Sequence, residues 1–234
     1  NLADVKDCSV IMGREPTDEL SASMAMYTCM QAADALFLGA DVCQMGTDQT
    51  KVINMARAYC DKSGGQYRKP IVLANPIISD LYGKSKMSKS KADAAIFVDD
   101  TPAVVKQKVM NAYCPEKQVV GNPCAEMMQY LVIPNVQTRN GNIINLPVVF
   151  DTQNGKRIEI RAVQDFTKAY SEGFITASDL RRNLIREINR LLEPIRTHFA
   201  TDETARELLL QVQSFSGSQN KTEAQNGAPN GLYH

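Results

Sequence analysis

Apolar and polar residues follow two different repeats in the first part of the chain. Small and apolar side chains recur at helical spacing over residues 21–33, whereas residues 35–42 form an almost unbroken apolar run, as in buried parallel strands. A second helix is predicted over residues 48–60 and a second short strand over residues 70–74, after a short strand at residues 9–12. This order predicts a doubly wound α/β fold, in which functional sites lie at the carboxyl ends of the strands.

The rest of the chain is predicted to be mainly helical. Turn signals at Asn140-Gly141 and Asn154-Gly155 stand among β-branched residues, which predicts a hairpin or extended excursion over residues 134–161. Residues 216–234 are polar and predict a disordered tail or a linker. Helices are expected from residue 102 and over residues 122–131, 162–171, 177–199 and 203–214.

Composition narrows the function classes only a little. Lysine plus arginine equal aspartate plus glutamate, at 26 each, so a nucleic-acid site would have to be a local patch. The six cysteines contain no Cys-x-x-Cys pair, which favours reduced thiols over a disulfide framework or a zinc site. Because no apolar run resembles a signal or a membrane span, we expect a cytoplasmic protein with no membrane partner and no bound metal.

A loop rich in lysine and serine follows the strand predicted at residues 70–74. Residues 83–90 read Gly-Lys-Ser-Lys-Met-Ser-Lys-Ser. Backbone amides and hydroxyls in such a loop can surround phosphate oxygens, and Lys86 and Lys89 can neutralise charge that develops on them. Taken alone, these letters also fit an ordinary exposed basic loop.

Two groups of polar residues precede this loop. Tyr27, Gln31 and Asp34 are spaced i, i+4 and i+7, so they would share one helix face and could bind an ammonium group and a phenolic hydroxyl. A half-exposed amphipathic helix would show the same spacing. Asp48 could accept both hydroxyls of a ribose, next to Gly46, which would leave room for a nucleotide. Taken alone, Asp48 fits a plain helix N-cap better.

The loop and the two polar groups together resemble a known family. Lys-Met-Ser-Lys-Ser resembles the second signature of class I aminoacyl-tRNA synthetases. The order of the three motifs, with the later Ala112-Tyr113-Cys114-Pro115, resembles eukaryotic and archaeal tyrosyl-tRNA synthetases over residues 21–215. The resemblance implies the second half of a Rossmann-like catalytic domain with its KMSKS loop over residues 1–100. A mainly α-helical anticodon-binding domain would follow over residues 101–215, before the tail at 216–234.

The resemblance assigns tyrosine binding to the first polar group and to the start of the second helix. Tyr27, Gln31 and Gln49 would hold the amino end of tyrosine, and Asp34 would accept its phenolic hydroxyl. A site built to hydrogen-bond that hydroxyl rejects phenylalanine by about 10⁴- to 10⁵-fold, because buried polar groups would otherwise stay unpaired.

ATP binding is assigned by the same resemblance. Asp48 would bind the ribose, and Gly46 would pack against the adenosine. Four residues of the loop would bind the triphosphate: Lys86, Met87, Ser88 and Lys89. The two lysines would be catalytic, because they meet the leaving pyrophosphate. Magnesium would accompany ATP as part of the substrate.

The family's first signature is absent from these 234 residues. The sequence contains no His-x-Gly-His, and its two histidines are His198 and His234. We therefore expect the chain by itself to be catalytically inactive, and to need the N-terminal segment of the same enzyme as a partner.

Contacts with tRNA are expected from the last long helix. Asp179 matches the family's anticodon-reading aspartate, although residues 176–179 also fit a plain capping box. Arg182 and Arg186 could meet phosphates, or they could belong to a solvated face that bridges to Glu187 and Glu193. No aromatic residue stands at residues 153–156, where the family has a base-stacking side chain, so anticodon reading is expected to be weakened or lost.

The interpretation that accounts for most of these residues is a tyrosine–tRNA ligase. Such an enzyme activates tyrosine with ATP to tyrosyl-adenylate and transfers it to tRNA(Tyr), and we expect a homodimer or a tandem pseudo-dimer. Three alternatives stay open. These are a catalytically weakened synthetase-like copy serving as half of such a dimer, a tryptophanyl-tRNA synthetase, and a general ATP- or tRNA-binding module. Asp34 favours a phenol over an indole.

Overall fold

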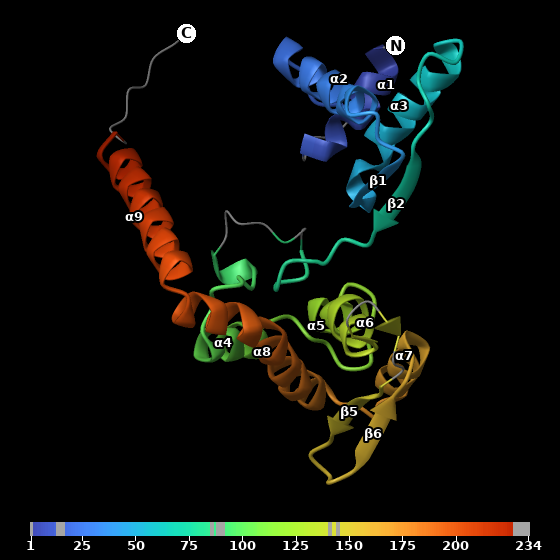
Figure 1. Cartoon of the computed structure of the whole chain (residues 1–234). Helices are drawn as coiled ribbons and strands as arrows, with labels where there is room; N and C mark the ends of the chain where they lie inside the picture. The colour runs from blue at the N-terminus through green and yellow to red at the C-terminus, as the bar shows by residue number, and fades with distance from the viewer. Residues whose placement is uncertain are drawn as a thin grey trace. The chain divides into compact units, whose positions relative to one another are not determined.

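The chain folds into two compact units. The computed structural model describes residues 2–12, 17–84, 87, 92–139, 142–143 and 146–226. The first unit is Asn1–Ile78 and the second is Ser79–His234 (Figure 1). The two units meet after Ile78, whereas the sequence analysis places the boundary between catalytic and anticodon-binding domains after residue 100. That functional boundary stays a prediction.

The first unit is a small α/β layer. Its helices and turns are α1 (Leu2–Asp7), the 3₁₀ turn η1 (Cys8–Met12), α2 (Ala22–Phe37), the 3₁₀ turn η2 (Thr47–Gln49) and α3 (Thr50–Lys62). Its strands, β1 (Val42–Gly46) and β2 (Ile71–Asn75), pair in parallel, with Val42 opposite Ile71 and Gly46 opposite Asn75. The β1–α3–β2 crossover confirms the predicted α/β class, and it brings the carboxyl ends of both strands to the same edge.

Two element predictions in this unit are wrong. Within the apolar run at 35–42, residues 35–37 end α2, residues 38–41 form a turn and loop around Gly39, where φ is +60°, and only Val42 belongs to a strand. Phe37 is 88% exposed, so the run is not a buried strand. Residues 9–12 lie in η1 rather than in a strand. An unbroken apolar run does not distinguish the end of a helix from a strand. Here Gly39, with its positive φ, ends α2 within the run.

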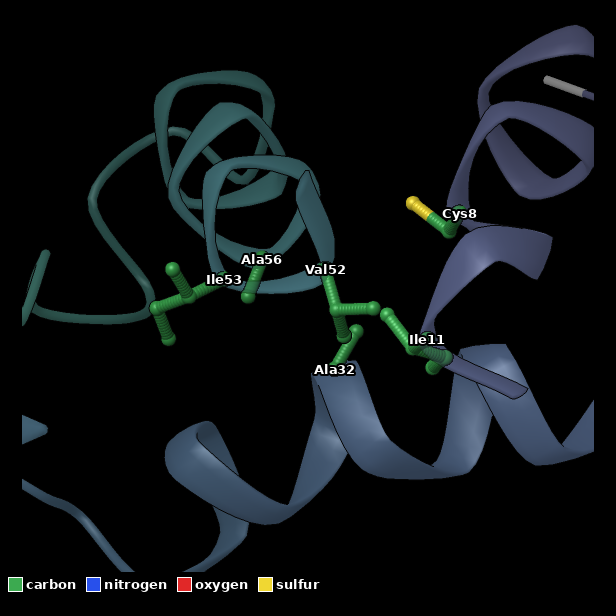
Figure 2. Packing of buried hydrophobic residues seen from close by; sticks show 6 residues of the cluster. All are labelled: Cys8, Ile11, Ala32, Val52, Ile53 and Ala56. Atoms are coloured by element: carbon green, nitrogen blue, oxygen red, sulfur yellow. The ribbon is translucent and has the colours of Figure 1, made fainter. Parts of the chain in front are cut away.

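Side chains from η1, α2 and α3 form the core of the first unit. The buried cluster consists of Cys8, Ile11, Ala32, Val52, Ile53 and Ala56. Figure 2 shows the side chain of Val52 extending from α3 towards Ile11 of η1 and Ala32 of α2. The small residue at position 32 permits close approach of α2 and α3. This packing fixes the helix faces that carry the polar groups described below.

The second unit is mainly helical, as predicted. Its helices are α4 (Pro102–Asn111), α5 (Pro123–Met127), α6 (Ile133–Val136), α7 (Val163–Glu172), α8 (Ala177–Thr201) and α9 (Glu203–Asn226), with a 3₁₀ turn at Ala92–Ala94 and a π-helical turn at Met128–Val132. Thr101 caps α4 by accepting from Val104 N at 3.3 Å. Asn122 caps α5 through Cys124 N and Ala125 N. Capping residues therefore identified these helix starts correctly.

Residues 134–161 contain two antiparallel pairs, as the turn signals predict. Strand β3 (Thr138–Arg139) pairs with β4 (Asn142–Ile143), and β5 (Val148–Asp151) pairs with β6 (Arg157–Ile160). The ring of Phe166 on α7 stacks on both Phe150 and Tyr170, with centroids 5.9 and 5.8 Å apart. This aromatic row ties the β5–β6 hairpin to α7.

Helix α9 reaches Asn226 and so enters the segment for which a disordered tail or linker is predicted. Residues 227–234 lie outside the described part of the chain. Among the described residues, no helix is both long and apolar enough to cross a bilayer.

Candidate active site

A pair of glutamines at the junction of α2, β1 and η2 forms the centre of the candidate site. Gln31 Nε2 on α2 donates to Gln49 Oε1 at the start of α3, at 2.6 Å. Both side chains line a cavity of about 210 Å³. The other lining residues are Ala35, Cys43, Gln44, Met45, Val52 and Ile53. The structure thus brings together two residues that are 18 positions apart and that the sequence assigned to one substrate.

Tyr27 and Asp34 occupy the same side of α2 as Gln31 but do not line this cavity. Their i, i+4, i+7 spacing keeps them in register along the helix. The Tyr27 residue is 54% exposed, and Asp34 is exposed as well. Both side chains are therefore accessible to solvent in the described structure.

Three residues of β1 were missed by the sequence reasoning. Cys43, Gln44 and Met45 line the cavity, and Gln44 adds an amide to a wall that is otherwise apolar on the strand side. The signal was present, because these residues lead directly into Gly46 and Asp48. Placing the strand at 35–42 put them beyond its end.

Gly46 lies at the carboxyl end of β1, where space is tight. A side-chain carbon at this position would lie 2.6 Å from Asp48 Oδ1 and 2.6 Å from Ile77 Cδ1. Asp48 lies in η2 and is half-buried. Helix α3 starts at Thr50 with Gln49 at its N-cap position, so the alternative in which Asp48 caps this helix is wrong. Its carboxylate instead faces Gly46 at the strand edge.

The start of the lysine loop, in the second unit, is held by a buried aspartate. Asp80 is 2% exposed, and its Oδ1 accepts from Tyr82 N at 3.1 Å and from Lys84 N at 2.9 Å. Leu81 O accepts from Tyr113 N at 2.7 Å. The sequence reasoning missed Asp80, although an aspartate that binds backbone amides two and four residues ahead is a common turn former.

Gly83 belongs to the same segment, residues 80–84, which leads into the lysine loop and is called the loop stem below. Its φ is +70°, and a side-chain carbon there would lie 2.8 Å from the Tyr113 ring and 3.2 Å from Gly121 O. Of loop residues 85–90, the structure describes only Met87, which is half-buried. The predicted loop residues Lys86, Ser88 and Lys89 lie outside the described residues.

Asp179, expected at the anticodon, is fully engaged within the protein. Its Oδ2 accepts from Thr176 N and Oγ1 at 3.2 and 2.7 Å, and its Oδ1 accepts from Gln153 N at 2.9 Å and from Arg182 Nη2 at 3.1 Å. Burial alone would raise the pKa of this carboxyl, but the hydrogen bonds from Thr176 and Gln153 hold the pKa below its usual value. The capping box weighed from the sequence is therefore present.

The arginines of α8 bind acidic and carbonyl groups of the same unit. Arg186 Nη1 lies 3.3 Å from Asp151 Oδ2, and its Nε donates to Glu187 Oε1 at 2.9 Å. Arg182 Nη1 donates to Asp151 O at 3.2 Å. Arg190 Nε reaches Glu187 Oε2 at 3.0 Å. Bridging to Glu187 is thus observed, and both predicted tRNA contacts, Arg182 and Arg186, remain about half exposed.

Comparison with known proteins gives a consistent result. The family model described as tRNA synthetases class I (W and Y) matches residues 3–193. The chain is 40% identical to cytoplasmic tyrosine–tRNA ligase 1 of Arabidopsis thaliana over 209 residues, which are 89% of this chain and 52% of that protein. The chain spans about half the length of such curated relatives.

Two solved structures share this architecture. Tyrosyl-tRNA synthetase of Leishmania major in complex with tyrosinol has a TM-score of 0.76 and 35% identity, covering 93% of this chain and 41% of that one. Tyrosyl-tRNA synthetase of Aeropyrum pernix has a TM-score of 0.74 and 28% identity, covering 92% and 59%. Both matches cover more than nine tenths of this chain.

Proposed function

The chain belongs to the class I tRNA synthetases of the tryptophan and tyrosine type. From this we propose that it acts as part of a tyrosine–tRNA ligase. In this reaction the carboxylate of tyrosine attacks the α-phosphorus of ATP. The bond to the leaving pyrophosphate breaks, and tyrosyl-adenylate forms. The tyrosyl group then passes to the 3′ end of tRNA(Tyr). Rate enhancement comes mainly from positioning and from charge neutralisation at the phosphates.

The observation that carries this proposal is the hydrogen bond between Gln31 and Gln49 beside the β1 cavity. Because Gln31 donates to Gln49, the second amide proton of Gln31 and the remaining lone pair of Gln49 Oε1 stay available for a ligand. An amino acid offers an ammonium donor and a carboxylate acceptor, which match these groups. Asp34 lies one helical turn further along the same side of α2 as Gln31.

Tyrosine is preferred to tryptophan for two reasons. A carboxylate at Asp34 can accept the single proton of a phenol, and the Leishmania relative was solved with tyrosinol, the alcohol that corresponds to tyrosine. The relatives reported above carry tyrosine in their names.

ATP would be bound as its magnesium complex. Two segments of this chain would supply the binding groups, one at the end of β1 and one at the lysine loop. Asp48 offers an acceptor at the strand edge beside Gly46, where a larger residue would not fit, and Asp80 preorders the backbone before Lys86 and Lys89. Among the described residues, no cluster of histidine, cysteine and acidic side chains suits a resident metal. Magnesium would accompany ATP as part of the substrate.

The remaining partners follow from the same proposal. Exposed parts of Arg182 and Arg186 would meet tRNA phosphates, whereas Asp179 would act mainly by fixing the start of α8. We also propose a dimer or pseudo-dimer, and a cytoplasmic location in line with the name of the Arabidopsis relative.

Replacing Gln31 tests the tyrosine site. The assay is ATP–pyrophosphate exchange by the chain joined to a relative's N-terminal segment that carries His-x-Gly-His, called here the completed enzyme. We expect Gln31→Ala to raise the KM for tyrosine by roughly tenfold to a hundredfold, as expected for losing one or two hydrogen bonds to a charged ligand. The matched control is Gln66→Ala, an exposed glutamine of the same unit, which should leave KM unchanged. Equal KM values for the two variants would contradict the assignment.

A further inference from the structure

One peptide group of the second unit is held from both sides. It joins Ala112, which follows the last residue of α4, to Tyr113. Its carbonyl oxygen, Ala112 O, accepts from Arg181 Nη2 of α8 at 3.0 Å. Its N–H, on Tyr113, donates to Leu81 O of the loop stem at 2.7 Å. Arg181 and the loop stem are therefore hydrogen-bonded to opposite ends of the same planar group.

The residues around this peptide group contact the loop stem at two points. Leu81 is 1% exposed, and its own N–H donates to Ala94 O at 2.9 Å, so the backbone of Leu81 is bonded on both sides. The ring of Tyr113 lies so close to Gly83 that a side-chain carbon there would be 2.8 Å from it. Because a peptide bond is rigid, any change in the direction of Ala112 O also turns the N–H of Tyr113.

Arg181 differs from its exposed neighbours on α8. Arg182 Nη1 donates to Asp151 O and Arg186 Nη1 pairs with the Asp151 carboxylate, so both side chains contact the end of β5. Arg181 instead binds the end of α4, and within the described part of the chain its buried Nε makes no hydrogen bond. A partly buried guanidinium with an unsatisfied donor is a costly way to fill space, because an apolar side chain would avoid the desolvation penalty. The carbonyl that Arg181 holds explains its place better than packing does.

The positive charge of Arg181 also acts on the second hydrogen bond of the peptide group. A hydrogen bond from a guanidinium is charge-assisted and stronger than one from a neutral donor. A strong donor at the carbonyl polarises the peptide group, so that its N–H becomes a better donor in turn. Removing the guanidinium should therefore weaken the bond from Tyr113 N to Leu81 O as well as free Ala112 O to turn.

We propose that Arg181 is a positioning residue for the lysine loop. It acts through the peptide group between Ala112 and Tyr113, which holds the loop stem at Leu81. The stem leads into the lysines that would bind the triphosphate of ATP. The effect on ATP binding therefore rests on the proposed function, whereas the effect on the stem does not.

Amide hydrogen exchange of the chain tests the positioning role without any activity assay. Arg181→Met keeps an unbranched apolar side chain and removes the guanidinium. We expect hydrogen exchange at Tyr113 N–H, followed by NMR, to accelerate roughly tenfold relative to that at Leu184 N–H within α8, as expected for losing one hydrogen bond to a charged group. Arg181→Lys keeps the charge and should accelerate it less. No acceleration at Tyr113, or an acceleration equal to that at Leu184, would overturn the proposal.

Arg196 offers a matched control on the same helix. Its Nε donates to Asp100 O at 2.9 Å, and its side chain is 15% exposed. Arg196→Met therefore removes a comparable arginine–carbonyl bond at the opposite end of α4 from Tyr113. We expect it to leave hydrogen exchange at Tyr113 unchanged relative to Leu184. Equal acceleration in Arg196→Met and Arg181→Met would show that a general loosening of α4 is responsible, and would overturn the assignment to the shared peptide group.

Kinetics of the completed enzyme test the consequence for ATP. Arg181→Met should raise the KM for ATP by roughly threefold to tenfold and leave the KM for tyrosine unchanged, because the proposed tyrosine groups belong to the first unit. Arg181→Lys should raise the KM for ATP less. An unchanged KM for ATP, or equal rises for both substrates, would contradict this consequence. If the unsubstituted completed enzyme shows no ATP–pyrophosphate exchange, the proposed function fails, while amide hydrogen exchange still decides the positioning role.

Discussion

Asp179 and Asp80, two buried carboxylates of the second unit, have roles that differ from those suggested by the sequence. Asp179 matches a family position for base recognition, yet its two oxygens accept four hydrogen bonds inside the protein. Asp80 has no such family role, yet it orders the backbone that leads into the lysine loop. Sequence spacing identified the capping box at Asp179 but not the contact with Gln153, because that contact depends on how the β5–β6 hairpin packs.

Asp179→Asn should lower the free energy of unfolding by about 2 kcal/mol at pH 7, because a buried charged acceptor is replaced by a neutral one. The folded-state pKa is below the unfolded value of about 3.9, so this stabilisation is present above pH ~4 and is lost as pH falls through the folded pKa. Urea denaturation at several pH values would measure this.

The control for this prediction is Asp165, which occupies the same position in α7 but is exposed. Its carboxylate accepts from Arg161 N and Ala162 N. Asp165→Asn should cost less than about 1 kcal/mol, as expected for an exposed cap. Equal losses for the two variants, or a loss at Asp179 that does not shrink in acid, would show that the buried network does not stabilise the fold as described.

Asp80→Ala should raise the KM for ATP of the completed enzyme by roughly tenfold, equivalent to about 1.4 kcal/mol, because the amides of Tyr82 and Lys84 lose their acceptor. Asp80→Asn keeps a carbonyl oxygen and should have a smaller effect. ATP-dependent exchange at saturating tyrosine would measure both variants. An unchanged KM for Asp80→Ala would mean that the stem does not position the loop.

At the scale of elements, the sequence predicted helices better than strands. The helix starts at Thr101 and Asn122 were found because caps are local, and the β5–β6 hairpin was found because Asn154-Gly155 lies in its turn. The strand at 35–42 was misplaced, because an apolar run gives no period and β1 carries half-exposed and exposed residues rather than a buried core. The cavity residues on β1 were missed for the same reason.

Gly83→Ala tests the turn that leads into the loop. Alanine at φ +70° is strained by about 1 to 2 kcal/mol, and its side-chain carbon would also meet the Tyr113 ring. Gly155 has nearly the same φ, +72°, but open space around it, so Gly155→Ala should show the strain alone. Urea unfolding should therefore give a clearly larger loss for Gly83→Ala. Similar losses at both positions would contradict the close packing against Tyr113.

At the scale of the whole molecule, family membership was predictable from three short motifs in a fixed order, although each alone had an ordinary structural explanation. The glutamine pair joins two of these motifs in the first unit. The third motif, the lysine loop, belongs to the second unit, where the structure describes its stem. The roles of Lys86, Ser88 and Lys89 stay predictions.

Amino-acid selectivity in ATP–pyrophosphate exchange by the completed enzyme tests the central claim most directly. We expect exchange with tyrosine, and kcat/KM for tyrosine about 10⁴-fold or more above that for phenylalanine and for tryptophan. Asp34→Ala should reduce the preference over phenylalanine by at least tenfold, as expected for the loss of the hydroxyl's acceptor. Exchange that favours tryptophan, or tyrosine selectivity that survives Asp34→Ala, would contradict the account.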